Sequence, residues 1–466
     1  MGKPERYGGH LMGIFDIPKL GEPKFLSPLK LSSIDGDAVC NYVSDDRRMR
    51  FNIYYPQEVL DYELKYSLRG DDVTKYINET IEVAGPRERI FFDPENTSCA
   101  IVTCGGLSPG LNNVVRAVVS ELYYSYHVKR ILGVRYGFAG LNPASGYELM
   151  PLHPDEIRTL SNFGGTFLGT SRGNQDVTVM VDELVKNKID VLFSIGGDGT
   201  QRGNYDIFKE IQRRNLPISV IGIPKTIDND IHLVEKTFGF ETAFSKAAES
   251  IICAHSEAQS HYNGIGLVKL MGRHSGFIAG YAALALSDVN YVLVPEVPFD
   301  LYGPKGFLED LRKRLERRQH AVIVVAEGAG QEYLTESGEK DESGNKRPSD
   351  IGMFLRNEIE KFLRKNNLGG TVKYIDPSYI IRSIPPTPGD ALFCSQLGQY
   401  AVHAGMSGRT GMLVAWRNNV FVHLPVSAVV NNTKKINPES SFWLSVLGAT
   451  GQPHNMVNRP RQYLPV

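Results

Sequence analysis

The chain has little cysteine, almost no net charge and no long apolar run. Its five cysteines in 466 residues show no Cys-x-x-Cys spacing, which argues against zinc sites and disulfides and indicates reduced thiols. A formal net charge of −1 gives no electrostatic reason to bind nucleic acid or an anionic membrane. No apolar segment has the length of a membrane span, and residues 1–20 lack the hydrophobic region of a secretion signal. We therefore expect a cytoplasmic protein that binds small molecules.

A regular alternation of strand-like and helix-like segments begins near residue 99. Expected strands cover residues 99–104, 130–134, 191–195, 218–223, 264–270, 291–294, 321–326, 372–375 and 411–416. Expected helices cover residues 111–124, 178–186, 205–213, 242–259, 276–286, 305–317, 351–365 and 391–406. Such alternation produces parallel sheets with helices on both faces. We predict an α/β fold with two doubly wound, Rossmann-like parallel-sheet domains that bind ligands at the carboxyl ends of the strands.

Both ends of the chain differ from this regular part. Residues 1–95 are rich in Tyr, Pro and charge, and contain one expected short helix at 56–66. We interpret them as an N-terminal extension that packs on another surface, such as a neighbouring subunit. The polar stretch 332–349 predicts a surface loop. Residues 431–466 carry no catalytic pattern and are interpreted as a docking tail.

The most informative segment, residues 189–203, reads IDVLFSIGGDGTQRG. Its first half is typical of a buried strand, and a helical segment follows at 204–214. A strand, a glycine turn and a helix are the parts with which an open α/β sheet presents backbone N–H groups to a phosphate. Asp198 is a hard oxygen ligand suited to Mg²⁺. A tight turn with a helix cap is the simpler alternative, but the complete Gly-Gly-Asp-Gly-Thr pattern favours a nucleotide site.

A second acidic segment, residues 223–230, reads IPKTIDND and follows an expected strand. If this segment is extended, the side chains of Thr226, Asp228 and Asp230 point to one side. A carboxylate that faces a substrate hydroxyl accepts its proton as a phosphoryl group arrives. The structural alternative is an Asx-turn in a loop. Next to two phosphate-type turns, we favour the catalytic interpretation.

Two loops provide further phosphate-binding candidates. Gly105 and Gly106 form a second glycine turn after a strand, and we expect their N–H groups to face a phosphate with support from the dipole of the next helix. Arg172 lies on a loop of small residues, where its planar guanidinium reaches phosphate oxygens. An arginine on a loop is more often simply solvated. Arg172 is therefore a phosphate-binding candidate only in combination with the other motifs.

The second half of the chain provides candidates for an anionic, hydroxylated substrate. The segment 269–276 reads KLMGRHSG, in which Arg273 suits an anion. Glu327 ends an expected strand and suits sugar hydroxyls as a hydrogen-bond acceptor. Tyr379 and Arg382 lie on one side of an expected turn and suit a sugar phosphate. None of these residues is specific by itself.

Together these motifs resemble the 6-phosphofructokinase family over residues 99–423, in the same order. The segments PKTIDND and MGR are highly specific to that family. The segments TCGG, GGDGTQRG and YIDPSY are most similar to its atypical ATP-dependent branch, which is related to the pyrophosphate-dependent enzymes and occurs in plants, trypanosomatids and some bacteria. The resemblance implies that ATP, with Mg²⁺, phosphorylates the 1-hydroxyl of fructose 6-phosphate in glycolysis. It also implies a homotetramer under allosteric control.

The resemblance implies a role for each matching residue. Asp228 matches the catalytic base, Arg172 a residue that stabilises charge on the moving phosphoryl group, and Asp198 the Mg²⁺ ligand. The nucleotide-binding positions are matched by Gly106, Arg172, Gly173, Gly197, Asp198, Gly199 and Thr200. The sugar-phosphate positions are matched by Thr226, Ile227, Asp228, Met271, Gly272, Arg273, Glu327, Tyr379, Ile380, Ile381 and Arg382.

The same resemblance divides the regular part of the chain into two expected domains. Residues 96–234, completed by about 408–430, form the nucleotide-binding domain, and residues 235–407 form the sugar-phosphate domain. Lys373 falls where many bacterial relatives have an arginine contributed across a subunit interface. A lysine keeps the charge but loses the bidentate fork of an arginine.

Two positions bear on the phosphoryl donor and point in opposite directions. The family's pyrophosphate users have Asp where this chain has Gly199, and such a side chain would crowd and repel the α-phosphate of ATP. Its common bacterial ATP users have Gly where this chain has Lys225, and its pyrophosphate users have Lys. We give more weight to Gly199, because steric and charge exclusion is harder to bypass than a lysine that swings aside.

Three alternatives to an ATP-dependent enzyme remain. A pyrophosphate-dependent, reversible phosphofructokinase fits Lys225. An NAD or lipid kinase shares the Gly-Gly-Asp-Gly-Thr turn but gives no reason for the TIDND and MGR segments. A catalytically silent regulatory subunit would not need Asp198, Asp228 and Arg172.

Overall fold

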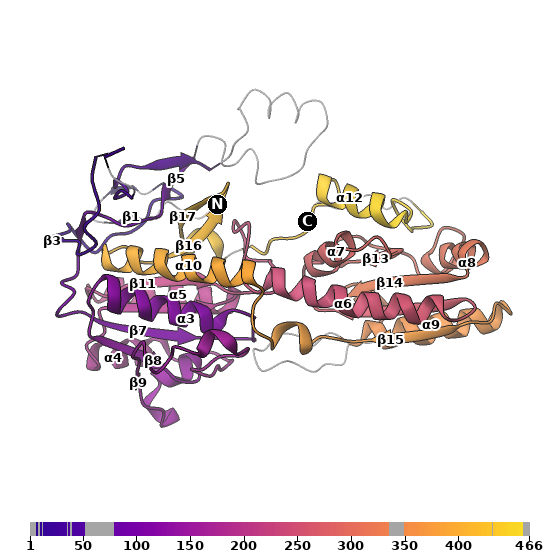
Figure 1. Cartoon of the computed structure of the whole chain (residues 1–466), viewed down its shortest axis with the longest axis horizontal. Helices are drawn as coiled ribbons and strands as arrows, with labels where there is room; N and C mark the ends of the chain where they lie inside the picture. The colour runs from indigo at the N-terminus through magenta and orange to yellow at the C-terminus, as the bar shows by residue number, and fades with distance from the viewer. Residues whose placement is uncertain are drawn as a thin grey trace.

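A computed structural model describes residues 6–7, 10–11, 13–34, 36–37, 40–51, 79–334, 349–430 and 432–459. These residues form an elongated molecule with a nine-stranded sheet toward one end of its long axis and a four-stranded sheet toward the other (Figure 1). The expected helix at 56–66 and most of the expected loop at 332–349 lie outside the described residues. No helix in the described part of the chain has the length and apolar character of a membrane span.

The larger sheet has nine strands and a parallel centre. The parallel strands, in spatial order, are β16 (Met412–Arg417), β11 (Ser219–Pro224), β10 (Val191–Gly196), β7 (Ser98–Thr103) and β8 (Arg130–Val134). Antiparallel strands extend both edges: β17 (Val420–Pro425), β5 (Thr80–Val83) and β4 (Arg48–Arg50) on one side, and β9 (Met150–Pro151) on the other. Strands β7, β10 and β11 are buried at every position, as expected for parallel strands covered on both faces.

Alternation along the central strands assigns the helices to the two faces of this sheet. In β10, Val191 and Phe193 belong to one apolar core and Leu192 belongs to the other, because successive side chains of a strand point to opposite faces. The first core is closed by α3 (Leu111–Ser120) and α10 (Pro388–Met406). The second core is closed by α4 (Val177–Lys186) and α5 (Asp198–Arg213).

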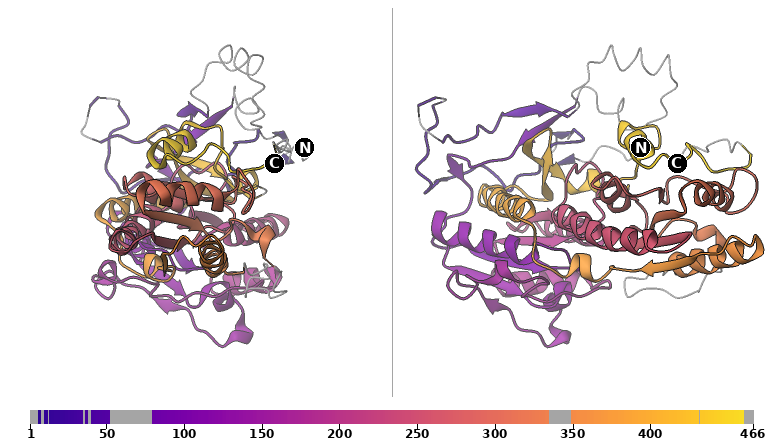
Figure 2. Two further views of the ribbon diagram at one scale, coloured as in Figure 1. Left: turned by 90° about the vertical axis from the view of Figure 1, so that its right-hand side faces the viewer. Right: turned by 45° about the vertical axis from the view of Figure 1, so that its right-hand side comes forward.

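The smaller sheet is parallel throughout and is also covered on both faces. Its strands are β13 (Tyr291–Leu293), β14 (His320–Ala326), β12 (Gly264–Leu270) and β15 (Thr371–Ile375), in spatial order. One face carries α6 (Phe240–Gln259) and α7 (Phe277–Leu284), with α12 (Ser441–Thr450) packed outside α7. The other face carries α8 (Phe307–Arg318) and α9 (Ile351–Lys365). Figure 2 shows this sheet between its helices.

The predicted α/β architecture with two doubly wound sheets is confirmed, and all nine expected strands are present within one or two residues of their expected bounds. Strand β17, the edge strands and α12 were not predicted. The described part of the N-terminal extension packs on the chain's own sheet, where Glu82 and Val83 of β5 pair with His423 and Val422 of β17. Two further ribbons pair β1 (Arg6–Tyr7) with β2 (His10–Leu11) and β3 (Phe25–Leu26) with β6 (Arg89–Ile90).

Candidate active site

The Gly-Gly-Asp-Gly-Thr segment joins β10 to α5 at the carboxyl edge of the larger sheet. Helix α5 begins at Asp198, six residues earlier than expected, so Asp198, Gly199 and Thr200 form its first turn. The N-cap residue Gly197 provides no side-chain cap, which leaves the N–H groups of this turn available to an anion. A Cβ placed on Gly199 would meet no described atom within 4 Å, so this position faces open space.

The second glycine turn contributes less than expected. The N–H of Gly105 already donates to the Ser171 carbonyl at 3.2 Å, so the prediction that it faces a phosphate is wrong. Helix α3 begins only at Leu111, five residues after Gly106, which also removes the expected support from its dipole. Gly106 keeps its candidate role, because cationic side chains gather around it.

Three cations from separate segments meet at Gly106. A Cβ built on Gly106 would lie 3.5 Å from Nη2 of Arg172 and 3.7 Å from Nη1 of Arg382. Nζ of Lys225 donates to the Gly106 carbonyl at 2.5 Å. Burial lowers the pKa of Lys225 to about 8, and both arginines act in the same direction. The arrangement suits a polyanion. The three positive charges repel one another, and a bound anion would relieve that repulsion.

The segment that carries Asp228 is a turn and not an extended strand, so the expectation of three side chains on one side of a strand is wrong. Asn229 has a φ of 53°, which reverses the chain locally. Thr226 Oγ1 accepts a hydrogen bond from the Asp228 N–H at 3.1 Å and donates to Oδ1 of Asp230 at 3.0 Å. The local turn is therefore closed by the Thr226 hydroxyl and is not the Asx-turn considered as an alternative, and it brings the two carboxyl groups together.

Asp228 is prepared to accept a hydrogen bond. Its Oδ1 is buried and has no hydrogen-bond partner among the described residues. Burial raises the pKa of this carboxyl group well above its usual value, and Asp230 and Glu327 raise it further, whereas Arg273 and Lys225 oppose them. A buried, unpartnered carboxyl oxygen is costly unless a ligand satisfies it. A raised pKa also makes the carboxylate a better general base near neutral pH.

The smaller sheet supplies the opposite wall of this site. Gly272 has a φ of 129° and accepts a hydrogen bond from the Gly328 N–H at 3.1 Å, which joins the ends of β12 and β14. Arg273 and Glu327 follow these strand ends, and both side chains act on the pKa of Asp228. Ser275 Oγ donates to the Asp228 carbonyl at 3.2 Å and ties the two turns together.

Arg382 reaches the site from the short 3-10 helix Ile380–Arg382. Ile381 is fully buried and anchors this helix in the core below α6 and α7, whereas Tyr379 and Ile380 are 71% and 64% exposed. The Arg382 guanidinium lies 5.0 Å from the centroid of the Tyr379 ring. Nε of Arg382 is also buried without a hydrogen-bond partner within the described part of the chain, so it is available to a ligand.

The candidate residues therefore do not all lie in one place. The structure brings together Gly106, Arg172, Lys225, Asp228, Arg273, Glu327 and Arg382, with Asp198 joined to them through Asp230. Lys373 lies apart on edge strand β15, where its Nζ is 3.6 Å from Glu257. Thr200 is buried, and its hydroxyl would lie 2.1 Å from a Cβ built on Gly196. The Thr200 side chain therefore packs against the end of β10, within its own glycine turn.

Asp198 and Asp230 have the chemistry of a divalent-cation site. Burial, and then the neighbouring Asp230 carboxylate, raise the pKa of Asp198 to about 7. A cation between such groups relieves both the burial and the repulsion. No three His, Cys, Asp or Glu side chains of the described residues form a metal cage. Mg²⁺ commonly uses one or two carboxylates with water and phosphate oxygens, so the residues present fit this ion.

Sequence reasoning missed Thr433 and Lys434, which lie in the tail after α11 (Val426–Val429). Thr433 forms an isolated antiparallel bridge with Ile231, and the Lys434 N–H donates to the Asp230 carbonyl at 2.8 Å. No local pattern marked these residues, because their partners lie about 200 positions earlier in the chain. The pair Asp228 and Asp230, in contrast, was visible in the TIDND segment.

Comparison with protein families matches residues 98–405 to the family described as Phosphofructokinase. A Borreliella burgdorferi protein named ATP-dependent 6-phosphofructokinase is 45% identical over 451 residues, 95% of this chain and 98% of that protein. A Trypanosoma cruzi protein of the same name is 44% identical over 368 residues, 78% of this chain and 75% of that protein. The solved structure of a pyrophosphate-dependent phosphofructokinase from Marinobacter aquaeolei shares the fold, with a TM-score of 0.64 at 20% identity over 76% of this chain and 91% of that chain. On this evidence the chain belongs to the phosphofructokinase family.

Proposed function

We propose that this chain is an ATP-dependent 6-phosphofructokinase, which transfers the γ-phosphoryl group of ATP to the 1-hydroxyl of fructose 6-phosphate. The observation that carries the proposal is Oδ1 of Asp228, which has no hydrogen-bond partner among the described residues and lies beside the cations Arg172, Lys225 and Arg382. A base next to a polyanion site is what phosphoryl transfer to a sugar alcohol requires. The relatives named ATP-dependent 6-phosphofructokinase support the choice of donor and acceptor.

In the proposed reaction, Asp228 removes the proton of the 1-hydroxyl while the oxygen forms its bond to the γ-phosphorus. The bond from that phosphorus to the β,γ-bridging oxygen breaks, and ADP leaves. The N–H groups of the first turn of α5 and the Arg172 guanidinium bind the phosphate oxygens. Asp198 would hold Mg²⁺, which supplies charge neutralisation on the phosphates when bound. Arg273, Glu327 and Arg382 position the sugar phosphate.

The region around Gly199 favours ATP over pyrophosphate. Open space at Gly199 leaves room for a nucleotide beyond the β-phosphate. Lys225, the residue that fits pyrophosphate, is held on the Gly106 carbonyl and is 5% exposed. In this position its Nζ lies against the Gly105–Gly106 turn, 3.5 Å from a Cβ built on Gly105. We therefore assign ATP as the donor, with pyrophosphate as the alternative that Lys225 supports.

A donor comparison tests this assignment. Initial rates are measured for the full chain with fructose 6-phosphate and Mg²⁺, with either ATP or pyrophosphate as the donor. We expect turnover with ATP and little with pyrophosphate. Turnover with pyrophosphate alone would overturn the donor assignment and leave the acceptor chemistry intact.

We also propose the remaining features of the family for this chain. They are a homotetramer, a cytoplasmic location, and a division into a nucleotide-binding domain (96–234 with about 408–430) and a sugar-phosphate domain (235–407), except that α10 packs on the larger sheet and so belongs with the first domain. Lys373 on the exposed edge strand β15 is proposed to face a substrate across a subunit interface. Light scattering with and without Lys373→Ala, together with KM for fructose 6-phosphate, tests both the assembly and this contact.

A further inference from the structure

The chain passes from the larger sheet to the smaller one before α6 and returns to the larger sheet before α10. Helix α6 covers the smaller sheet and α10 covers the larger one, and both begin where the two halves of the molecule meet (Figure 1). The first turns of these two helices contact each other. We call residues 238–242 and 386–390, which contain these turns, the helix junction.

A buried carboxylate joins the two helices at the junction. Oδ2 of Asp390, in the first turn of α10, accepts hydrogen bonds from the Thr242 N–H at 2.8 Å and from the Thr242 hydroxyl at 2.7 Å. The Thr242 hydroxyl in turn accepts a hydrogen bond from the Thr387 N–H at 2.9 Å. Each helix therefore provides an acceptor for a backbone N–H at the start of the other, where no helical carbonyl is available.

The contact between Asp390 and Thr242 is closed to water. The two residues are 0% and 1% exposed. Oδ1 of Asp390 is buried and has no hydrogen-bond partner among the described residues, so Thr242 supplies both hydrogen bonds of this carboxylate. Loss of a partner from such a group is costly, because water does not replace it. The geometry of the junction therefore depends on this pair.

The helix junction also packs on the segment that leads from the Gly105–Gly106 turn to α3. Ser108 Oγ donates to the Phe238 carbonyl at 3.1 Å. A Cβ built on Gly110 would lie 3.2 Å from the Phe238 ring and 3.8 Å from Cβ of Pro386. Both passages of the chain between the sheets are thus in contact with the residues that follow Gly106.

The position of Arg382 follows from the place of the junction. Only residues 383–385 separate Arg382 from the junction, and Nη1 of Arg382 lies 3.7 Å from a Cβ built on Gly106. Ile381, beside it, is buried in the core of the smaller sheet. Arg382 therefore comes from the smaller half and reaches the glycine turn of the larger half. How the two halves are joined determines how far it reaches.

We propose that Asp390 and Thr242 are positioning residues for the sugar phosphate, because together they hold the two halves of the molecule at the separation at which Arg382 binds fructose 6-phosphate. The inference rests on the proposed function, since it takes Arg382 as part of the sugar-phosphate site. Neither Asp390 nor Thr242 lies in a segment that carries the family resemblance. Both act through Arg382 and not by contact with a substrate.

The test compares the steady-state kinetics of two Thr242 variants with those of the parent chain. Thr242→Val removes the hydroxyl and keeps the shape of the side chain, whereas Thr242→Ser keeps the hydroxyl. Because the proposed ATP contacts lie on the larger sheet, Thr242→Val should raise the KM for fructose 6-phosphate by about tenfold and leave the KM for ATP within about twofold of the parent value. Thr242→Ser should restore the KM for fructose 6-phosphate. Ser256→Ala is the matched control, because its exposed hydroxyl donates to the Ile252 carbonyl of its own helix, α6.

A double-mutant cycle tests whether the two residues act as one unit. Asp390→Ala removes the acceptor of both Thr242 bonds and should raise the KM for fructose 6-phosphate as Thr242→Val does. The double variant should raise it no further, because each change breaks the same contact. Independent, multiplying effects on this KM would contradict a shared role of Asp390 and Thr242.

The outcomes separate the inference from the proposed function. If the parent chain is active and Thr242→Val keeps its KM for fructose 6-phosphate, the positioning role is overturned and the enzyme assignment stands. If kcat and both KM values change together, the junction is a general structural contact, and the positioning role is overturned as well. If the parent chain does not phosphorylate fructose 6-phosphate, the proposed function fails and the inference fails with it.

Thermal unfolding shows whether each variant is folded. If Thr242→Val does not fold, Thr387→Ala decides the question, because it removes the cap hydroxyl of α10 and keeps both hydrogen bonds between Thr242 and Asp390. This milder change should raise the KM for fructose 6-phosphate by about threefold, with the KM for ATP unchanged. An unchanged KM for fructose 6-phosphate in Thr387→Ala would overturn the inference.

Discussion

At the scale of single residues, the chemistry of this chain depends on carboxyl groups placed where their charge is disfavoured. Asp228 is buried, has neighbouring carboxyl groups and has one oxygen without a partner among the described residues. The sequence predicted Asp228 as the candidate base because the TIDND segment is specific. It did not predict how the segment folds, because the turn depends on Asn229 adopting a positive φ.

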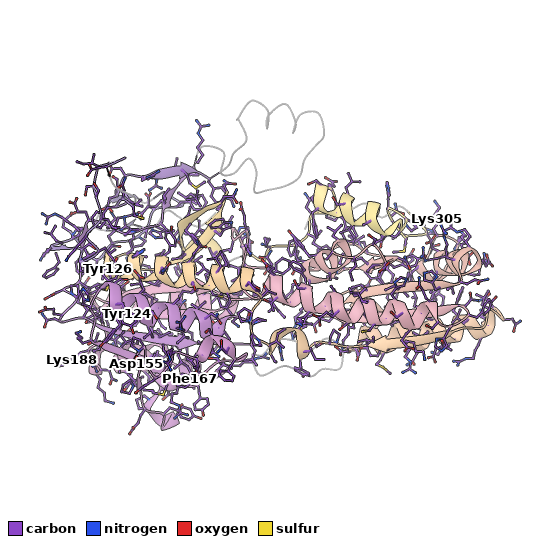
Figure 3. The ribbon with its side chains drawn as sticks, viewed as in Figure 1. Tyr124, Tyr126, Asp155, Phe167, Lys188 and Lys305 are labelled. Carbon is purple, nitrogen blue, oxygen red and sulfur yellow. The ribbon has the colours of Figure 1, made fainter. Side chains whose placement is uncertain are left out.

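Replacing Asp228 with Asn tests its role as the base. The amide is nearly isosteric but accepts no proton, so we expect kcat to fall by roughly 10²–10⁴-fold with little change in KM for fructose 6-phosphate. Steady-state kinetics measures both constants. Asp155→Asn is the control, because Asp155 lies on the outer surface at the end of the larger sheet and its side chain is 82% exposed (Figure 3). A small change in kcat for Asp228→Asn would show that another group removes the proton.

At the scale of elements, one tight contact sets the distance between two arginine-bearing loops. A Cβ on Gly164 would lie 2.0 Å from the Ser383 carbonyl oxygen, so only glycine allows this approach. The loop of Gly164 leads to Arg172, and Ser383 follows Arg382 directly. Both side chains meet at Gly106. The contact therefore determines the geometry of the cationic part of the site.

Gly164→Ala should weaken the site without unfolding the chain. Relief of the overlap costs roughly 1–3 kcal/mol and moves the two loops apart. We expect kcat/KM for fructose 6-phosphate to fall by about tenfold or more, with a cooperative thermal transition preserved. The control is Gly448→Ala in α12, where a Cβ meets no described atom within 4 Å and helix propensity improves. Unchanged kcat/KM in Gly164→Ala would show that the loops adjust freely.

The elements that were predicted have strong local signals, and those that were missed are short or lie at an edge. The central strands read as apolar runs followed by glycine turns. Strand β17 follows β16 through Asn418 and Asn419, which have φ values of 47° and 62°. Two such residues between apolar runs are typical of a type I′ hairpin, so the sequence does carry a local signal for β17.

At the scale of the whole molecule, a buried polar network joins the N-terminal extension to the larger sheet. Glu82 of β5 accepts hydrogen bonds from Arg87 at 3.1 Å and from Nδ1 of His423 on β17 at 2.8 Å, and it also pairs with Arg409. All four residues are less than 5% exposed. Such a network is costly to break, because each charge loses partners that water cannot replace.

The network makes stability depend on pH. Burial lowers the pKa of His423 to about 4, so the folded protein keeps this ring neutral, whereas the unfolded chain binds a proton near the ordinary value of 6.5. Between these values the unfolded chain holds more protons, so the free energy of unfolding falls as the pH falls. This one ring accounts for a loss of about 2 kcal/mol between neutral pH and about pH 5.

His423→Asn isolates that contribution. The Asn amide keeps a donor for Glu82 and does not titrate. The free energy of unfolding is measured by urea denaturation at about pH 7.5 and about pH 5. We expect its decrease between these two pH values to be about 2 kcal/mol smaller in the variant than in the parent. His403, whose pKa burial lowers to about 3, is unchanged in both and cancels in the comparison. An equal loss in both proteins would contradict a neutral, buried His423.

The assembly of the site across the molecule is what the sequence could not show. Arg172, Asp228, Arg382 and Thr433 lie on four segments that are far apart in the chain, and their meeting depends on how the two sheets pack. Motif specificity identified three of these residues one by one. Thr433 has no motif, and its place beside Ile231 follows only from the path of the tail between the sheets.

The most direct test of the account is the donor preference of Gly199→Asp. Open space at Gly199 means that the new side chain fits without disturbing α5, and an acidic residue in the first turn suits the helix dipole. Its carboxylate would repel the α-phosphate of ATP, so we predict a fall in kcat/KM for ATP of more than about 100-fold. Gly199→Ala should keep most of the activity. If Gly199→Asp used ATP as well as the parent chain does, open space at Gly199 would not be the basis of ATP use.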